Sequence, residues 1–385
     1  MRLLHVIWTL DPSWGGPVGQ LIQKASDHAR HGHSVEVVTF DRPSEPWLGG
    51  LPFKTHLLPC WSHTYRYSPQ LVPWLRSHAG AYDVVLAHGM YLYCSLGVWR
   101  ALRGHATPYF VYPHGALGHW LRKAYPLKHA KKYAYWLAWG YRIMRDARAV
   151  IYDCEEDRRQ SATCFWPYQC REILSPSGTS APVNDETASQ QLVRQFPELA
   201  GKRIWLFVGR VHPQKACDLL VRAFARVAGR DADVQLVIMG PDQSGWSACL
   251  SSLASSLGVA SRITWTGLVS ETVKRGAYQS AEAFVLPSHF ESFGLVVVEA
   301  MSYGLPVIVS NQVAIWREIE MDSAGMVCAD TVEGVTVALE HWLSMPEAER
   351  KEMGARAKAS FLQRYEVHNV AEHLLTQLRA NGACG

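Results

Sequence analysis

The sequence of 385 residues lacks several features that mark common classes of protein. Its nine scattered cysteines form no C-x-x-C motif, which argues against a structural zinc site and favours reduced thiols in a cytosolic protein. It has no apolar run of transmembrane length, no low-complexity segment and no repeat of solenoid period. Its net charge of +4 is too small to indicate nucleic-acid binding. The N-terminal segment lacks the apolar core and cleavage site of a secretory signal, so we expect it to form a first strand.

The chain is long enough for two hydrophobic cores. A length of 385 residues exceeds one ordinary core, and 48% hydrophobic with 19% charged residues is normal for a soluble globular protein. Residues 175–189 are rich in Ser, Pro, Gly and Thr, which predicts a linker. We therefore expect an N-terminal domain over residues 1–183, a second domain over residues 184–365, and a terminal helix within residues 366–385.

Short apolar runs alternate with helical patterns in both halves, which favours doubly wound parallel sheets and an α/β fold. In the first half, strands are predicted at residues 3–8, 34–39, 54–58, 83–88, 108–112, 149–152 and 172–174. In the second half, strands are predicted at residues 203–208, 234–239, 263–266, 283–286 and 307–310. Helices are predicted at residues 295–303 and from about Thr331, the latter capped by Asp330.

The turn after the first predicted strand contains Gly15 and Gly16, followed by Pro17 at a favourable first helical position. The turn lacks the G-x-G-x-x-G fingerprint, which disfavours a nicotinamide cofactor. Two interpretations of the glycines stay open. The backbone at Gly16 lets a phosphate or an acceptor approach closely, or the two residues form only an ordinary tight turn.

The segment Leu286 to Pro306 carries the strongest chemical pattern in the chain. Glu291 and Glu299 stand eight positions apart, and the predicted helix between them begins at Gly294. The N–H groups at such a helix start, here those of Gly294 and Leu295, favour an anion such as a phosphate. The Glu299 carboxylate can accept hydrogen bonds from a sugar diol, and Glu291 can reach a second sugar. These groups suit a nucleoside-diphosphate sugar, although two glutamates at this spacing also occur by chance.

Two cations follow the first strand of the second half. Arg210 offers a planar fork for a diphosphate, and Lys215 offers a point charge. Together they can neutralise a departing diphosphate without a metal. The alternative is that both are loop charges that only contact solvent, which is the usual role of an isolated Arg or Lys. The turn at Gly267-Leu268, on the same side of the predicted sheet, is a candidate base pocket or simply a turn.

His114 follows a predicted strand in the sequence Pro113-His114-Gly115. Ligands of open α/β sheets bind beyond the carboxyl ends of the strands, so His114 is placed to touch substrate. The alternative is a structural histidine, which is the commoner role of a lone histidine.

Residues 120–148 mix basic with aromatic side chains. A basic segment with interfacial aromatics can dock on an anionic membrane or a lipid carrier. Alternatively, the aromatic stripe packs on the sheet and the lysines are solvated. The basic residues in question are Lys123, Lys128, Lys131 and Lys132.

The string ESFGLVVVEAMSYGLPVIVS, from Glu291 to Ser310, resembles the E-(x)7-E segment of retaining glycosyltransferases of family 4. The stretch from Arg210 to Lys215 resembles the family's G-R-(x)4-K segment, with Ala216 where the family usually has glycine. The GGP loop at 15–17, HGM at 88–90 and PHGAL at 113–117 resemble bacterial polysaccharide-assembly members of the family.

The resemblance implies a GT-B fold, with two Rossmann-like domains facing a cleft. The acceptor would bind the N-terminal domain, the donor would bind the second domain, and the last helix would cross back to the first. The implied reaction is metal-independent, retaining transfer of a hexose from a UDP- or GDP-linked sugar to a glycan or lipid-linked acceptor. Its setting would be cell-surface polysaccharide synthesis, in the cytoplasm or on the inner face of the plasma membrane.

The resemblance also assigns roles to individual residues. Glu291 and His114 would act at the reaction centre, Glu299 would bind the ribose and Leu268 the base. The diphosphate would be held by Arg210, Lys215, Gly294, Leu295 and Gly16. Two other classes of function stay open: a non-hydrolysing nucleotide-sugar epimerase of the same architecture, and a non-catalytic protein that binds nucleotide sugars or glycans.

Overall fold

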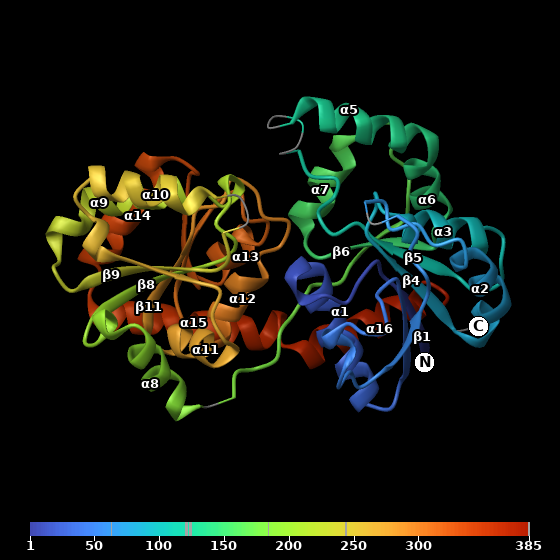
Figure 1. Cartoon of the computed structure of the whole chain (residues 1–385), viewed down its shortest axis with the longest axis horizontal. Coiled ribbons are helices and arrows are strands. Elements are labelled where there is room, and N and C mark those ends of the chain that lie inside the picture. The colour runs from blue at the N-terminus through green and yellow to red at the C-terminus, as the bar shows by residue number, and fades with distance from the viewer. Residues whose placement is uncertain (63, 120–121, 123–124, 184, 243–244, 384–385) are drawn as a thin grey trace. The chain divides into compact units, whose positions relative to one another are not determined.

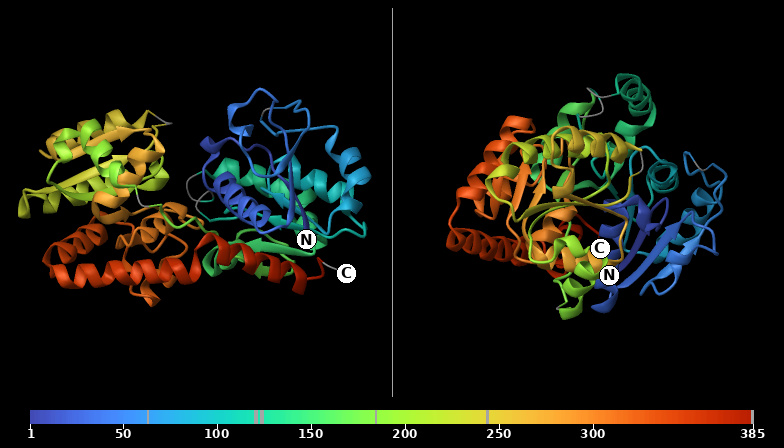
Figure 2. Two further views of the ribbon diagram at one scale, coloured as in Figure 1. Left: turned by 90° about the horizontal axis from the view of Figure 1, so that it is seen from below. Right: turned by 60° about the vertical axis from the view of Figure 1, so that its left-hand side comes forward.

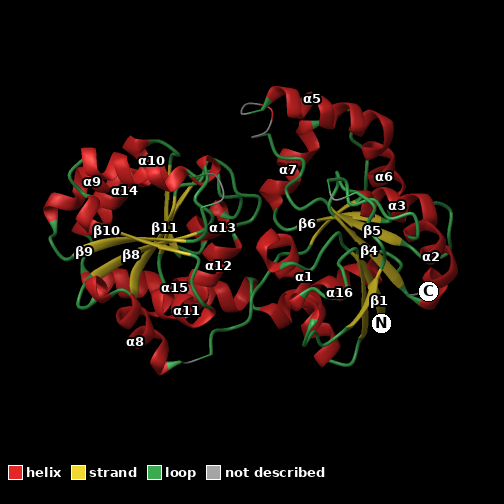
Figure 3. Cartoon of the chain, in the orientation of Figure 1, coloured by secondary structure: helices red, strands yellow, loops and turns green. Residues whose placement is uncertain are grey.

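The computed structural model describes residues 1–385 apart from residues 63, 120–121, 123–124, 184, 243–244 and 384–385. The chain divides into two compact units (Figure 1). Unit 1 comprises Met1–Ser180 and Val367–Gly385, and unit 2 comprises Ala181–Glu366. Each unit is built on one parallel sheet with helices on both faces (Figure 3). The predicted α/β class with two Rossmann-like sheets is confirmed.

Unit 1 contains a seven-stranded sheet in the order β3-β2-β1-β4-β5-β6-β7. Its strands are β1 Arg2–Val6, β2 Ser34–Thr39, β3 Lys54–Leu57, β4 Val84–His88, β5 Tyr109–Tyr112, β6 Ala149–Tyr152 and β7 Glu172–Leu174. Its helices are α1 Gly16–Arg30, α2 Leu71–His78, α3 Tyr93–Leu102, α5 Pro126–Tyr135, α6 Tyr141–Asp146, α7 Glu155–Cys164 and α16 Val367–Ala380.

Unit 2 contains a six-stranded sheet in the order β10-β9-β8-β11-β12-β13. Its strands are β8 Arg203–Val208, β9 Val234–Met239, β10 Ile263–Gly267, β11 Ala281–Leu286, β12 Val307–Ser310 and β13 Gly325–Cys328. Its helices are α8 Glu186–Gln195, α9 Cys217–Val227, α10 Trp246–Ser256, α11 Glu271–Ser280, α12 Leu295–Ser302, α13 Trp316–Met321, α14 Val332–Ser344 and α15 Glu347–Arg364.

The central strands form because they are apolar along their whole length. Every residue of β4 and of β9 is buried, as expected for parallel strands covered on both faces. The strand order reverses between β1 and β4 in unit 1, and between β8 and β11 in unit 2. In open α/β sheets, ligands commonly bind beyond the carboxyl ends of the strands at such a reversal.

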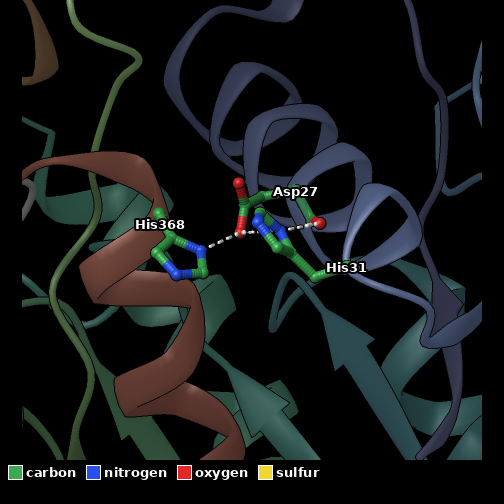
Figure 4. A group of neighbouring side chains, drawn as sticks. All are labelled: Asp27, His31 and His368. Atoms are coloured by element: carbon green, nitrogen blue, oxygen red, sulfur yellow. Dashed lines mark hydrogen bonds and ion pairs between the residues drawn. The ribbon is translucent and has the colours of Figure 1, made fainter.

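Helix α16 packs against α1 within unit 1 (Figure 2). The buried Asp27 carboxylate accepts a hydrogen bond from His368 Nδ1 over 3.1 Å, and His31 Nδ1 donates to the Asp27 carbonyl oxygen over 2.9 Å (Figure 4). The ligand atoms of this group lie within 4.8 Å of one another. Because each Nδ1 already donates a hydrogen bond, we interpret the group as a tie between two helices and not as a metal centre.

Two sequence predictions were wrong in detail. Thr331, not Asp330, caps α14, because the Thr331 side chain accepts from the N–H of Gly334. The Asp330 carboxylate instead pairs with His289 Nδ1 over 2.9 Å. The predicted linker at residues 175–189 also ends early, because α8 begins at Glu186. The Asp185 side chain caps this helix by accepting a hydrogen bond from the N–H of Thr187. Among the described residues we find no helix with the length and hydropathy of a membrane span.

Candidate active site

The candidate donor site lies at the carboxyl edge of the unit 2 sheet, where three neighbouring strands end at glycines. Gly209 follows β8 and its N–H donates to the Met239 carbonyl over 2.9 Å, while the Gly240 N–H after β9 donates to the Gly267 carbonyl over 3.0 Å. A Cβ at Gly240 would lie 2.0 Å from the Gly209 carbonyl oxygen. Only glycine allows these turns to pack so closely, and this packing fixes where the loop at Arg210 begins.

The loops after β8 and β11 are bound to each other. Gln214 Nε2 donates to the Phe290 carbonyl over 3.0 Å, and the His289 N–H donates to the Gln214 carbonyl over 2.9 Å. Beside these bonds, Lys215 Nζ forms an ion pair with Glu291 Oε2. Their side chains are 14% and 18% exposed, so solvent screens this pair only weakly. The structure thus brings together the predicted phosphate cation and the predicted sugar-binding carboxylate.

The amino end of α12 lies three residues beyond Glu291. Gly294 precedes the helix as its N-cap residue with φ 97° and ψ 55°, a conformation that favours glycine, and it has no side chain to cap the helix. A Cβ at Gly294 would come within 3.1 Å of Val313. The half-buried Leu295 is the first residue of the helix. The helix dipole and the first backbone N–H groups make this end a natural site for an anion.

Glu299, in the middle of α12, is held from α11. Lys274 Nζ lies 3.0 Å from Glu299 Oε2, and the buried Tyr278 hydroxyl donates to the same oxygen over 3.0 Å. Burial opposes the charge on Lys274, but the carboxylates of Glu299 and Glu271 outweigh it, so the Lys274 pKa is raised. Both contacts fall on Oε2, and no donor among the described residues reaches Oε1. Oε1 is therefore oriented and ready to accept a hydrogen bond from a ligand.

The remaining predicted residues of unit 2 lie on the same edge of the sheet. Arg210 is exposed directly after Gly209, and the Leu268 side chain, after β10, is 81% exposed. Ala216 takes the left-handed conformation, with φ 53° and ψ 39°. The backbone after Lys215 thus adopts a conformation suited to the glycine that the family usually has there.

The chain contains the D-x-D string Asp231-Ala232-Asp233, which in some proteins marks a metal site. Here the string precedes β9, so it lies at the edge of the sheet opposite to Lys215 and Glu291. Asp231 pairs with Arg203 at the start of β8. This string therefore gives no reason to place a metal at the candidate site.

In unit 1 the predicted His114 lies just beyond β5 and contacts two further histidines. His88 Nδ1 and His114 Nε2 are 2.9 Å apart, and His5 Nδ1 and His88 Nε2 are 3.0 Å apart. His114 has a φ of 53°, an unusual conformation for a residue with a side chain. Gly16, by contrast, is an ordinary first helical residue. It is Gly15 that needs a positive φ, of 74°.

The basic aromatic segment forms α5 and a following π-helical turn. Trp136 is fully buried in the unit 1 core, as the packing interpretation predicts. Lys132 Nζ lies 4.4 Å from the centre of the Tyr91 ring, so this lysine points inward. Lys128 and Lys131 are exposed, whereas Lys123 is outside the described residues.

Two family models together match most of the chain. The model described as glycosyl transferases group 1 matches residues 189–360, and the model described as glycosyl transferase 4-like domain matches residues 15–169. The chain belongs to the group 1 glycosyltransferases of family 4.

The curated relatives of this family 4 member match over part of their length. A D-inositol 3-phosphate glycosyltransferase from Rhodococcus opacus is 36% identical over 146 residues, which is 36% of this chain and 33% of the relative. The protein of that name from Mycobacterium tuberculosis is 31% identical over 182 residues, or 46% of this chain and 37% of the relative. The match thus spans about a third of the length of these relatives.

Solved structures share the GT-B fold over nearly the whole chain. HepE from Anabaena, solved with UDP and glucose, has a TM-score of 0.78 at 16% identity and covers 99% of this chain and 100% of its own. Sucrose-phosphate synthase from Thermosynechococcus elongatus has a TM-score of 0.79 at 20% identity, with 99% of each chain covered. At these identities the likeness shows the fold alone.

Sequence reasoning missed four residues that complete these clusters. Lys274 and Tyr278 are one helical turn apart on α11, and nothing in the sequence indicates that α11 lies beside α12. His5 and His88 were also missed as partners of His114. The H-G pair at the end of β4 repeats the H-G pair after β5, and this repetition was the available signal for His88.

Proposed function

We propose that the protein is a retaining glycosyltransferase that moves a hexose from a nucleoside-diphosphate sugar to a saccharide acceptor. The observation that carries the proposal is the arrangement around α12. An uncapped helix start lies between a Lys215–Glu291 ion pair and an oriented Glu299. The helix start and Lys215 provide positive potential for a diphosphate. The carboxylates of Glu291 and Glu299, on either side, can accept hydrogen bonds from hydroxyl groups.

In the proposed donor complex, Arg210, Lys215 and the N–H groups at Gly294 and Leu295 hold the diphosphate. Their positive charge stabilises the negative charge that develops on the leaving group. Glu299 Oε1 accepts from the ribose hydroxyls. When a phosphate takes over Lys215, Glu291 is released to bind hydroxyls of the sugar. Leu268 would cover the base, and no metal is required in this scheme.

The acceptor is assigned to unit 1, where a cavity of about 600 Å³ lies at the carboxyl ends of β1, β2 and β3. Trp47 contributes an aromatic side chain to its lining, and Glu45 and Arg42 contribute charges. This mixture of flat apolar surface and hydrogen-bonding groups suits a saccharide, and the volume is within the range of ligand sites. The backbone at Gly16 remains a candidate contact of a phosphate.

Peripheral membrane binding is a further part of the proposal. Leu127 on α5 is 87% exposed beside the exposed Lys128 and Lys131. An exposed apolar side chain flanked by lysines suits an anionic lipid surface. Co-sedimentation with vesicles that contain anionic lipid should fall for Lys128→Glu with Lys131→Glu, and should not change for Lys351→Glu on the exposed surface of α15.

A thermal-shift panel of UDP, GDP, ADP and their sugars tests donor binding first, because a ligand of the native state raises its melting temperature. UDP-glucose leads the panel, since a fold neighbour was solved with it. Incubating the best donor with and without saccharide acceptors then separates the classes. A glycoside product supports transfer, an epimer formed without acceptor supports the epimerase, and binding without turnover supports a binding protein.

A further inference from the structure

Three histidines from three adjacent segments of unit 1 form one continuous hydrogen-bonded chain. The N···N distances are 3.0 Å from His5 to His88 and 2.9 Å from His88 to His114. The imidazole of His88 stacks with both neighbours, at ring-centre distances of 5.3 Å and 5.1 Å. The strand order explains the chain, because β1, β4 and β5 are neighbours and His5 pairs in register with Leu86, two residues before His88.

All three imidazoles are neutral near pH 7. Burial lowers the pKa of His5 to about 3 and that of His114 to about 3, and it lowers the pKa of His88 well below its ordinary value. The nearby Lys24 ammonium lowers all three further. A neutral imidazole has one N–H donor and one bare nitrogen that accepts. His88 uses both nitrogens, so it donates to one neighbour and accepts from the other.

This restriction leaves only two arrangements of protons. In the first, His5 Nδ1 donates to His88 Nε2, and His88 Nδ1 donates to His114 Nε2. In the second, both hydrogen bonds run in the opposite direction. The arrangements differ at the ends of the chain, namely at His5 Nε2 and at His114 Nδ1.

The environment of His5 Nε2 selects the first arrangement. This atom is buried and has no hydrogen-bond partner among the described residues. The second arrangement would leave an unpaired N–H donor there, whereas the first leaves only a bare nitrogen, which is the less costly defect. His28 shows that this interior tolerates the defect, because its Nε2 donates to the Ala371 carbonyl over 2.9 Å and its Nδ1 is buried, bare and unpaired.

We propose that His5 and His88 are positioning residues that fix His114 with its proton on Nδ1, so that His114 presents a hydrogen-bond donor to an oxygen of a saccharide bound at unit 1. His114 Nδ1 has no partner among the described residues, and the side chain is partly exposed. The assignment to a sugar rests on the proposed function; the assignment of the proton does not. In this arrangement His114 Nδ1 donates and does not act as a base.

The proton position is measured directly by two-bond ¹H–¹⁵N correlation spectra of the full chain with labelled histidine, where protonated and bare nitrogens differ in chemical shift. The signals of His114 are those lost in His114→Asn. We expect a protonated Nδ1 and a bare Nε2 in the wild type. A proton on Nε2 of His114 would overturn the proposal, whatever reaction the protein catalyses.

Two substitutions of His88 test the positioning role. His88→Phe keeps a stacked ring but removes the donor to His114, so the Nε2–H form of His114 should appear. His88→Asn places an amide nitrogen near the former Nδ1, so the Nδ1–H form should be retained. If the His114 signals are the same in His88→Phe as in the wild type, the positioning role is wrong. The wild-type spectrum still decides the proton position should His88→Phe not fold.

Turnover provides the second readout. With a donor and an acceptor found as above, kcat/KM should fall at least 10-fold in His88→Phe and return to within about threefold of the wild type in His88→Asn. Equal losses in both variants would contradict the role of the donated proton. A wild type without any transferase activity would contradict the proposed function and leave the spectroscopic test intact.

Discussion

Lys215 and Glu291 form an ion pair that joins the loops after β8 and β11, the two strands at which the sheet of unit 2 reverses its order. In this pair, each charged group has a partner of opposite charge, and both side chains are mostly shielded from water. A diphosphate that reaches Lys215 therefore competes with Glu291 for the same ammonium. Donor binding is expected to exchange one anionic partner of Lys215 for another, and to turn Glu291 into a ligand of the sugar.

This exchange predicts opposite effects of the two partners on nucleotide affinity. Lys215→Met should weaken UDP binding about 10- to 100-fold, since a hydrogen bond to a charged group contributes about 1.5–3 kcal/mol. Glu291→Gln should leave UDP affinity equal or improve it, because the competing carboxylate is gone, while turnover falls at least 100-fold. Isothermal titration calorimetry and initial rates measure the two quantities. Equal losses of UDP affinity in both variants would show that the pair acts only as a structural bridge.

The second prediction concerns the close approach of Gly240 to Gly209. In Gly240→Ala the added methyl group meets backbone at 2.0 Å, at a φ of 137° that disfavours a side chain. We expect unit 2 to lose about 3 kcal/mol or more of stability, together with nucleotide binding. Gly229→Ala is the matched control, because nothing lies within 4 Å of its added methyl group. The control should change the free energy of unfolding by less than about 1 kcal/mol. Chemical denaturation followed by tryptophan fluorescence compares the two.

The sequence was most informative where a local pattern suffices to define a structure. The strands at residues 34–39, 203–208 and 234–239 were predicted with their observed bounds, because buried parallel strands are mostly apolar runs between turn residues. Helix α12 was predicted with its Gly294 start because a pattern suited to a helix lies between Gly294 and Gly304. Asp330 and Thr331 show the limit, since either residue can cap a helix and only the tertiary contact of Asp330 with His289 decides between them.

The contacts of the candidate site could not be predicted in the same way. The ion pair of Lys215 with Glu291 joins residues 76 positions apart, and it exists because β11 lies beside β8 in the sheet. His5 and His88 are 83 positions apart and meet for the same kind of reason. The spacing of Glu291 and Glu299 and the strand-end position of His114 predicted them as candidates, but tertiary packing determines which groups pair with or hydrogen-bond to them.

The third prediction tests Glu299 as the ribose ligand through its support on α11. Tyr278→Phe removes the hydroxyl that donates to Glu299 Oε2 and retains the buried ring, so the carboxylate loses one of its two anchors. UDP affinity should fall about 3- to 10-fold, in line with one hydrogen bond. The loss should be much smaller for a dideoxy nucleotide that lacks both ribose hydroxyls. An equal loss for both nucleotides would mean that Glu299 does not bind the ribose.

The last prediction is a pH dependence of stability that arises from the buried histidine chain. Burial lowers the pKa of His5 from 6.5 to about 3. Between these pH values His5 is protonated in the unfolded chain but neutral in the folded chain. Stability from this residue is thus intact above pH 6.5 and is lost as the pH falls toward 3. At pH 5, which is 1.5 units lower than 6.5, the loss is about 2 kcal/mol for one such residue.

His5→Phe removes this proton uptake while keeping a buried ring. The fall in the free energy of unfolding between pH 7 and pH 5 should therefore be about 2 kcal/mol smaller in His5→Phe than in the wild type. Comparing the two proteins cancels the contributions of all groups whose surroundings are the same in His5→Phe as in the wild type. His341→Gln is the control, because its exposed imidazole loses little water on folding. If His5→Phe loses as much stability as the wild type over this range, His5 is not a neutral buried imidazole, and the proton arrangement inferred for the chain to His114 loses its basis.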